Sequence, residues 1–361
     1  MLVRRWSWLL IETPARAAGF LTAVAILAAL LLRLELGQSW NLYAAGTQVT
    51  KAGDDYQLLL QNVGSAFQET GGELVVLLGG STIRELTADD ALLSKQLTAW
   101  CERDVQFVNL GSSSQSFSES WDIAALVPEN RKRLFIVGIN PNRLGFDDDS
   151  VMTELSHRPS GIPVSFSLLW NVALHTGHVG SSERIISAIA RQERLGAKWR
   201  LRDVFVAPQP VARKPSEDSL QPDRASYREP VWTHAEKLRQ ANAYIATRVT
   251  DFRNRYRAGV QWYNRFHDRF KGPNSDVKFV VPPTDKTFDK VNELISTDFL
   301  NAIRLLGGES RTIDLRNRVR DLDTKDFFDT QHLVAKGREK LHPVFFDAVT
   351  RALGCPLRAS Q

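Results

Sequence analysis

The chain has 361 residues, of which 43% are hydrophobic and 24% are charged, and its formal net charge is +5. These proportions are typical of a folded globular protein and leave room for one large domain or two small ones. The basic residues are scattered and often have acidic neighbours, and the sequence holds no long basic tract with interleaved aromatic residues. The composition therefore argues against a nucleic-acid partner.

Cysteine and histidine spacing does not indicate a metal site. Cys101 and Cys355 lie far apart and form no metal-ligand pattern. They can pair in an oxidising compartment, but the sequence does not establish that they do. His175 and His178 are three residues apart, yet no third ligand is in view. We expect neither a metal nor a cofactor.

An apolar run over residues 17–32 is broken only by one glycine and one threonine and is followed by Arg33. With Arg33 reaching to the interface, the run is just long enough to cross a bilayer, which needs roughly 17 residues or more. Arginines precede the run, and this bias places the N-terminus in the cytoplasm. We therefore expect residues 1–36 to form a cytoplasmic stub and one transmembrane helix, with the rest of the chain periplasmic or extracellular. A cleaved signal peptide and a buried helix are the alternatives.

Beyond the anchor, alternating strands and helices predict an α/β fold. Residues 37–72 are interpreted as a tether and a first helix, which covers residues 54–70. Strands are expected at residues 74–78, 105–110, 134–137, 277–281 and 312–315, and helices at 91–101, 118–126, 235–270, 289–306 and 334–353. Strands that end in small or polar loops and lead into helices are typical of a parallel sheet, which binds ligands beyond the carboxyl ends of its strands. We expect a three-layer sandwich around a central, mostly parallel sheet.

One block interrupts this alternation. Residues 146–230 contain several prolines, a run of three aspartates and a helix candidate at 182–195. A long, loop-rich segment of this kind is typical of an insertion or a lid. It divides the main domain into an N-terminal part, residues 73–145, and a C-terminal part, residues 231–361.

Ser81 follows five consecutive apolar residues and the pair Gly79-Gly80, at the position where a helix would begin. A buried strand, a tight turn and a helix N-terminus would hold its hydroxyl beside free backbone N–H groups. This geometry suits either a nucleophile or a phosphate cradle. The phosphate interpretation lacks the lysine of a P-loop, and an extracytoplasmic location argues against nucleotide use.

A nucleophilic serine needs a base, and His332, with Asp329 three residues before it, can supply one. The carboxylate can lie against one imidazole nitrogen and leave the other free for the serine proton. Gly111 and Asn140 follow two other predicted strands, where a backbone N–H and a side-chain amide can both point at an oxyanion. Taken alone, each of these residues is better explained as a turn or surface residue.

Two arginines near these motifs are candidates for substrate binding. Arg84 follows Ser81 by three residues and can flank the floor of a pocket. Arg143 lies just beyond Asn140, where it can contact an anionic substrate. Solvation at the protein surface explains both arginines at least as well.

The order of the motifs resembles that of the SGNH (GDSL-like) hydrolase superfamily. Its four blocks correspond to Ser81, Gly111, Gly138-x-Asn140 and Asp329-x-x-His332, over about residues 73–142 and 275–352. The resemblance implies a flavodoxin-like α/β fold in which Ser81 attacks an acyl ester, His332 is the general base and Asp329 orients it. It also implies an oxyanion hole formed by the N–H groups of Ser81 and Gly111 and by the side chain of Asn140.

Two positions depart from the family pattern. Gly80 stands where the family has an aspartate before the serine, and Pro141 stands where it has one after the asparagine. Neither change removes a catalytic group. With the anchor, they make the chain resemble the branch that modifies cell-envelope polymers, such as the D-alanine transfer protein of teichoic acid synthesis and the alginate O-acetylation proteins.

This resemblance implies an acylated cell-envelope polysaccharide as the substrate and a membrane-bound O-acyltransferase as a partner. The reaction would be ester hydrolysis or acyl transfer, depending on whether water or a sugar hydroxyl accepts the acyl group. The alternative is a non-catalytic SGNH-like subunit that binds the polysaccharide or scaffolds the acyltransferase.

Overall fold

The computed structural model describes residues 72–87, 89–112, 115–157, 165, 167–168, 171–172, 231–316, 318–319 and 321–356. Within them, five strands form one sheet in the order β2-β1-β3-β4-β5, and all neighbouring strands are parallel. The strands are β1 (Glu73–Leu78), β2 (Val105–Asn109), β3 (Lys132–Gly138), β4 (Ser275–Val281) and β5 (Thr312–Asp314). The chain passes outward from β1 to β2 and then returns across β1 to β3. Because this reversal is where α/β sheets bind ligands, the ends of β1 and β3 are the expected site.

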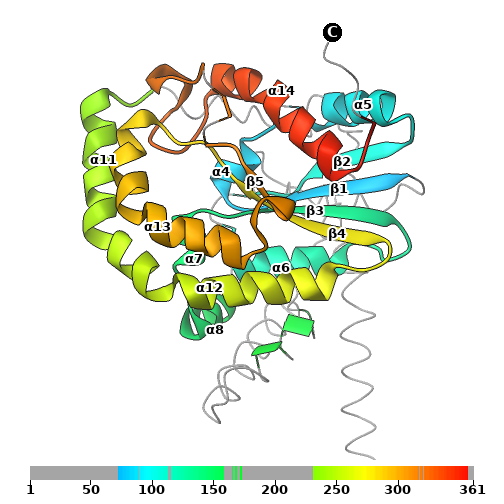
Figure 1. Ribbon diagram of the computed structural model, residues 1–361, viewed down its shortest axis with the longest axis horizontal. Coiled ribbons are helices and arrows are strands. Elements are labelled where there is room, and N and C mark those ends of the chain that lie inside the picture. Colours follow the sequence, from blue (N-terminus) through cyan, green and yellow to red (C-terminus); the bar gives the residue numbers. More distant parts are fainter. Residues whose placement is uncertain are drawn as a thin grey trace, which may run out of the picture.

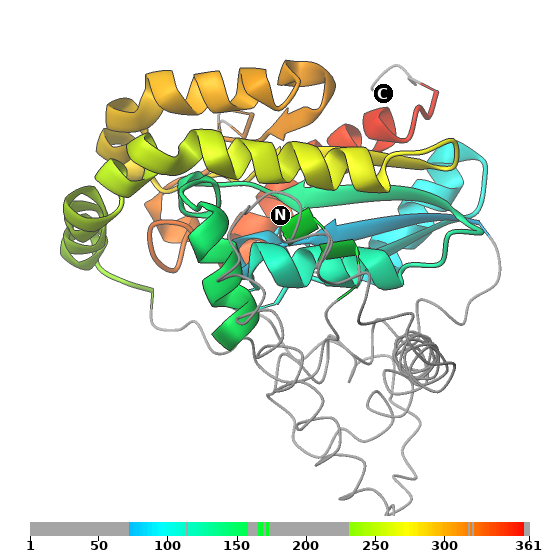
Figure 2. The same ribbon diagram turned by 90° about the horizontal axis from the view of Figure 1, so that it is seen from below.

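Helices cover both faces of the sheet (Figure 1 and Figure 2). One face packs against α6 (Phe117–Leu126), α8 (Asp148–His157), α11 (His234–Thr247), α12 (Val249–Phe270) and α13 (Asp289–Leu305). The other packs against α5 (Asp90–Cys101) and α14 (Ala335–Ala352). The single turns α4 (Ser81–Arg84) and α7 (Pro141–Leu144) directly follow β1 and β3, and η2 (Lys286–Phe288), η3 (Gly308–Ser310) and η4 (Thr324–Asp326) are short 3₁₀ segments. The predicted α/β fold with a mostly parallel central sheet is confirmed.

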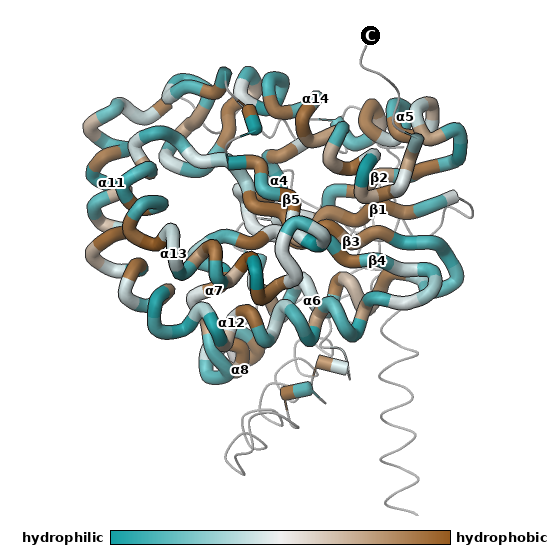
Figure 3. Tube along the Cα trace, in the orientation of Figure 1, coloured by the Kyte–Doolittle hydropathy of each residue, from teal (hydrophilic) through white to brown (hydrophobic). Residues whose placement is uncertain are grey.

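The central strands explain why the sequence forms this sheet. All six residues of β1 are buried, and its side chains alternate between the two hydrophobic cores. Leu74, Val76 and Leu78 join the core under α6 and α12, whereas Val75 and Leu77 join the core under α5 and α14. Figure 3 shows hydrophobic residues along β1 and β3. A strand that is buried on both faces is apolar along its length rather than alternating, as residues 74–78 of β1 are.

Two elements differ from the prediction. The helix predicted over residues 235–270 is two helices, α11 and α12, which are separated at Arg248. Buried residues occur at helical spacing on both sides of this break, as Tyr244 and Phe252 do, so periodicity alone did not reveal it. The second difference is that the start of the predicted insertion belongs to the main domain. It forms α8, whose Val151 and Leu155 are buried in the hydrophobic core.

Several predictions concern residues outside the described part of the chain. They are the anchor at residues 17–32, the first helix at 54–70 and the helix at 182–195, together with most of the insertion at 146–230. Among the helices of the described residues, none is both long enough and apolar enough to span a membrane.

A disulfide joins Cys101, the last residue of α5, to Cys355, which lies just beyond α14. The two cysteines are 254 residues apart in the sequence. The bond therefore links the part of the domain before the predicted insertion to the part after it, on the face of the sheet that α5 and α14 cover.

Candidate active site

Ser81 begins α4 directly after β1 and the turn Gly79-Gly80. Gly79 has a φ of +151°, and a Cβ atom there would lie 2.7 Å from Cγ1 of the buried Ile83. Both the backbone conformation and the lack of space therefore require glycine. The Gly80 carbonyl accepts the N–H groups of Ile83 and Arg84 at 2.9 and 3.0 Å, so the helical turn starts at once and holds Ser81 at the carboxyl end of β1.

Three side chains from opposite ends of the described chain form a hydrogen-bonded relay. His332 Nε2 lies 2.8 Å from Ser81 Oγ, and His332 Nδ1 lies 2.7 Å from Asp329 Oδ2. The other carboxylate oxygen of Asp329 accepts the backbone N–H groups of Gln331 and His332 at 2.8 and 2.9 Å. Because a carboxylate only accepts hydrogen bonds, we assign the imidazole proton to Nδ1, which leaves Nε2 to accept the proton of Ser81.

The environment keeps Asp329 ionised. Burial of its carboxyl group acts to raise its pKa, but the hydrogen bond and charge of His332 and the N–H groups of Gln331 and His332 outweigh burial and lower the pKa to about 2. An ionised carboxylate orients the imidazole and stabilises the imidazolium that forms when a serine gives up its proton. Asp329 is therefore in the form that an orienting partner of His332 requires.

Asn140 follows β3, the strand next to β1, and caps α7. Its Oδ1 accepts the backbone N–H of Arg143 at 2.9 Å. The amide oxygen is thus occupied, and Nδ2 is left as the donor that an oxyanion would need. The Arg143 guanidinium lies beside the turn before Ser81, because a Cβ atom on Gly80 would be 3.6 Å from its Nη2. Of the two predicted arginines, Arg143 is the one whose guanidinium group lies beside the turn before Ser81.

Two predicted site residues have other roles. The N–H of Gly111 donates to Asn109 Oδ1 at 3.0 Å, so this donor is not free for an oxyanion. The Asn109 amide also donates to the Arg84 carbonyl at 2.8 Å and thereby joins the end of β2 to α4. Arg84 is only 5% exposed, and its Nη2 lies 3.8 Å from a carboxylate oxygen of the buried Glu85. We therefore correct both assignments, since Gly111 stabilises the turn after β2 and Arg84 lies in the interior.

Gln115 is a site residue that the sequence did not reveal. Its Oε1 accepts the N–H of Gly79 and the hydroxyl of Ser120, both at 2.8 Å, and its Nε2 donates to the Leu110 carbonyl at 2.7 Å. One buried side chain thus connects the turn before Ser81, the end of β2 and α6. A glutamine after a Gly-Ser loop indicates a site residue only when that loop is known to lie beside the serine turn, and the sequence alone does not show this.

No protein-family model matches the chain, and no curated protein matches it significantly. The chemical interpretation of the site therefore rests on the geometry of its residues.

Proposed function

We propose that the chain is a membrane-anchored, extracytoplasmic SGNH-type serine esterase or O-acyltransferase that acts on acyl esters of cell-envelope polysaccharide. The observation that carries this proposal is the relay from Ser81 through His332 to Asp329, with contacts of 2.8 and 2.7 Å. A serine hydroxyl is a weak nucleophile until a base takes its proton, and this arrangement supplies both the base and the carboxylate that orients it. A subunit that only binds or scaffolds has no need of all three groups.

In the proposed mechanism, Ser81 Oγ attacks the carbonyl carbon of an acyl ester while His332 Nε2 takes the hydroxyl proton. Asp329 stays ionised and stabilises the imidazolium. The Ser81 N–H and Asn140 Nδ2 hold the negative oxygen of the tetrahedral intermediate. When the intermediate collapses, His332 gives its proton to the leaving oxygen, which departs as an alcohol and leaves an acyl-enzyme.

The second half of the reaction repeats the first with a new nucleophile. His332 takes a proton from water or from a sugar hydroxyl, whose oxygen attacks the acyl-enzyme. Collapse of this second intermediate returns the proton to Ser81 Oγ and releases an acid or a new ester. Water as the acceptor gives an esterase, and a sugar hydroxyl gives a transferase.

Several observations support the other parts of the proposal. The strand order is that of flavodoxin-like doubly wound sheets, and Ser81 and Asn140 follow the two strands at its switch point. The disulfide between Cys101 and Cys355 suits an oxidising compartment, in agreement with the predicted anchor. A membrane-bound O-acyltransferase would be the partner that supplies the acyl group.

Replacement of Ser81 tests the proposal. We expect Ser81→Ala in the full chain to lower p-nitrophenol release from p-nitrophenyl acetate about 1,000-fold or more, because no other atom can form the acyl-enzyme. A fluorophosphonate probe, which reacts with activated serines, should label the unmodified protein and not this variant. Ser296→Ala is the control, since Ser296 is exposed on α13 and, within the described part of the chain, its hydroxyl bonds only the Glu293 carbonyl. Unchanged turnover in Ser81→Ala would favour the non-catalytic alternative.

A further inference from the structure

His332 and Asp329 lie in an irregular segment between β5 and α14. Among the residues of this segment that the structure describes, the only regular features are the short turn η4 and an isolated bridge between Phe327 and Leu333. The segment therefore lacks the backbone ladder that holds Ser81 at the end of β1. The relay nevertheless requires His332 Nε2 to stay within hydrogen-bond distance of Ser81, so other contacts must hold this segment in place.

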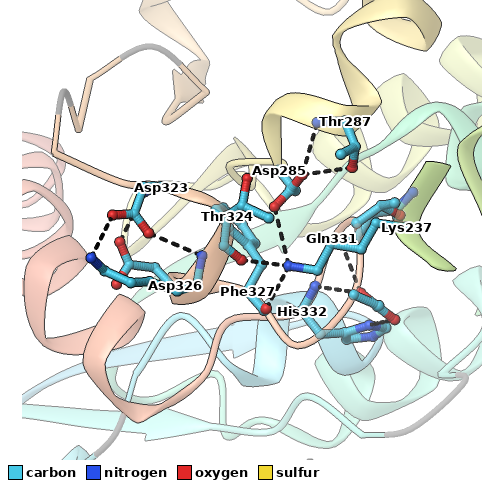
Figure 4. A network of polar contacts seen from close by, with 12 residues as sticks. Lys237, Asp285, Thr287, Asp323, Thr324, Asp326, Phe327, Gln331 and His332 are labelled. Atoms are coloured by element: carbon cyan, nitrogen blue, oxygen red, sulfur yellow. Dashed lines mark hydrogen bonds and ion pairs between the residues drawn. The ribbon is translucent and has the colours of Figure 1, made fainter. Parts of the chain in front are cut away.

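Lys237 of α11 is fully buried and directs its ammonium group at this segment (Figure 4). Its Nζ donates to the carbonyl oxygens of Thr324 and Phe327, the second at 2.8 Å, and lies 3.2 Å from Asp285 Oδ2. An ammonium group has three protons, and these three acceptors use all of them. Two of the acceptors are main-chain atoms shortly before Asp329, so the charge of Lys237 fixes the course of the backbone there.

Gln240 lies one turn further along α11 and holds Thr330, the first of the two residues between Asp329 and His332. Its Oε1 accepts both the backbone N–H and the hydroxyl of Thr330, at 3.1 and 2.7 Å. On the other side, the Thr330 carbonyl accepts the N–H of Asp285 at 2.9 Å, and Thr330 is fully buried. The backbone next to the catalytic pair is therefore fixed in both directions.

We propose that α11 is the positioning element of the active site, with Lys237 and Gln240 as positioning residues that hold His332 and Asp329 against Ser81. The inference rests on the proposed serine mechanism and goes beyond it by naming residues that touch neither substrate nor reacting atoms. A role limited to stability does not require these groups, because buried ion pairs often add no more stability than well-packed apolar residues.

The experiment compares variants of α11 in the full chain with p-nitrophenyl acetate as the substrate. Lys237→Met removes the ammonium group, and Gln240→Leu removes the acceptor for Thr330, while Gln240→Glu keeps an oxygen at that position. Arg239→Met is the matched control, because Arg239 is an exposed cation on the same helix. Leu97→Ala is a second control, which destabilises the core at α5 and removes no polar group.

We expect Lys237→Met and Gln240→Leu to lower kcat about 10- to 100-fold with KM changed less than about twofold, since displacement of a catalytic group by about 1 Å can have an effect of this size. Their rates of fluorophosphonate labelling should fall in parallel. Gln240→Glu should recover most of the kcat lost in Gln240→Leu. Arg239→Met and Leu97→Ala should keep kcat, although Leu97→Ala lowers the melting temperature.

Three results decide the outcome. If Lys237→Met and Gln240→Leu keep kcat while Ser81→Ala abolishes turnover, the positioning proposal is wrong and the serine mechanism stands. A loss of kcat in Leu97→Ala equal to theirs, at equal melting temperature, would reduce their role to stability and overturn the proposal as well. If Lys237→Met does not fold, the pair Gln240→Leu and Gln240→Glu decides alone.

Discussion

The two halves of the proposed relay are held in different ways. Ser81 is fixed by the chain immediately around it. A fully buried strand precedes it, and the constrained backbone of Gly79 and the hydrogen bonds of the single turn α4 set its position. His332 and Asp329 lie in an irregular segment, and the side chains that hold this segment come from α11. Gln240 and its partner Thr330 are 90 residues apart in the sequence.

This difference separates two kinds of sensitivity. On the nucleophile side, a small backbone change at the turn should disturb both stability and Ser81, because the same atoms determine both. On the base side, the chemistry can be altered with little change in the fold, because the polar groups of the loop can be exchanged singly. Variants on the two sides should therefore differ in the ratio of lost activity to lost stability.

Among the variants that keep Ser81, the largest effect is expected for Asp329→Asn, on the base side. The Asn oxygen can still accept the N–H groups of Gln331 and His332, so the loop keeps its shape. The amide nitrogen, however, is a donor, so His332 Nδ1 must accept from it and the imidazole proton moves to Nε2. A protonated Nε2 cannot accept the proton of Ser81. We expect kcat/KM for p-nitrophenyl acetate to fall about 100- to 10,000-fold.

The control for this variant is Asp323→Asn, which removes one negative charge from the same segment without contacting His332. The Asp323 side chain accepts from the Lys325 N–H instead. If Asp329→Asn kept kcat/KM within about threefold of the unmodified protein, the pair of Asp329 and His332 would not be catalytic.

A smaller loss of activity, combined with a loss of stability, is expected for Gly79→Ala on the nucleophile side. The new Cβ would lie 2.7 Å from Cγ1 of Ile83, and the alanine backbone would have to adopt a φ of +151°. Backbone strain of this kind lowers the free energy of unfolding by about 1–3 kcal/mol, and we expect a parallel loss of turnover because Ile83 and Ser81 share α4.

Gly80→Ala is the matched control for the turn. A Cβ atom there would meet only the Arg143 guanidinium, at 3.6 Å, and Gly80 has an ordinary extended backbone. Its effect on the free energy of unfolding in urea should stay within about 1 kcal/mol. Equal destabilisation by the two substitutions would contradict the local constraint that we assign to Gly79.

The sequence predicts the parts of the site that local contacts determine better than the parts that distant segments determine. The apolar run of β1 and the two glycines identify the serine turn, because the residues that form this turn are adjacent in the sequence. The spacing of Asp329 and His332 likewise predicts their contact. The role of Gly111 could not be predicted, because the partner of its N–H depends on the rotamer of Asn109.

The rest of the site could not be predicted because its contacts join distant segments. Lys237 looks like a solvated charge on an amphipathic helix, and nothing in its neighbourhood indicates that it is buried against Asp285 and Thr324. The pairing of Cys101 with Cys355 also depends on how α5 and α14 pack. Such residues become identifiable only when the fold brings together parts of the chain that share no local pattern.

The smallest predicted effect is the dependence of stability on pH at the base side. The pKa of Asp329 is lowered to about 2 in the folded protein, below its ordinary value. The ionised carboxylate therefore contributes its full stabilisation above about pH 4 and loses it as the pH falls towards 2. The total is about 2 kcal/mol, of which roughly half is lost at pH 3. Asp329→Asn lacks this group, whereas all other carboxyl groups remain.

Unfolding in urea at pH 6 and pH 3 measures this difference. The unmodified protein should lose about 1 kcal/mol more than Asp329→Asn between the two pH values. Because both proteins share every other carboxyl group, the excess reports the interaction of Asp329 with His332 and the two backbone N–H groups. Equal losses would mean that Asp329 has the same pKa in the folded and unfolded chains. The base side would then be held by α11 alone, without a stabilising contribution from the charge of Asp329.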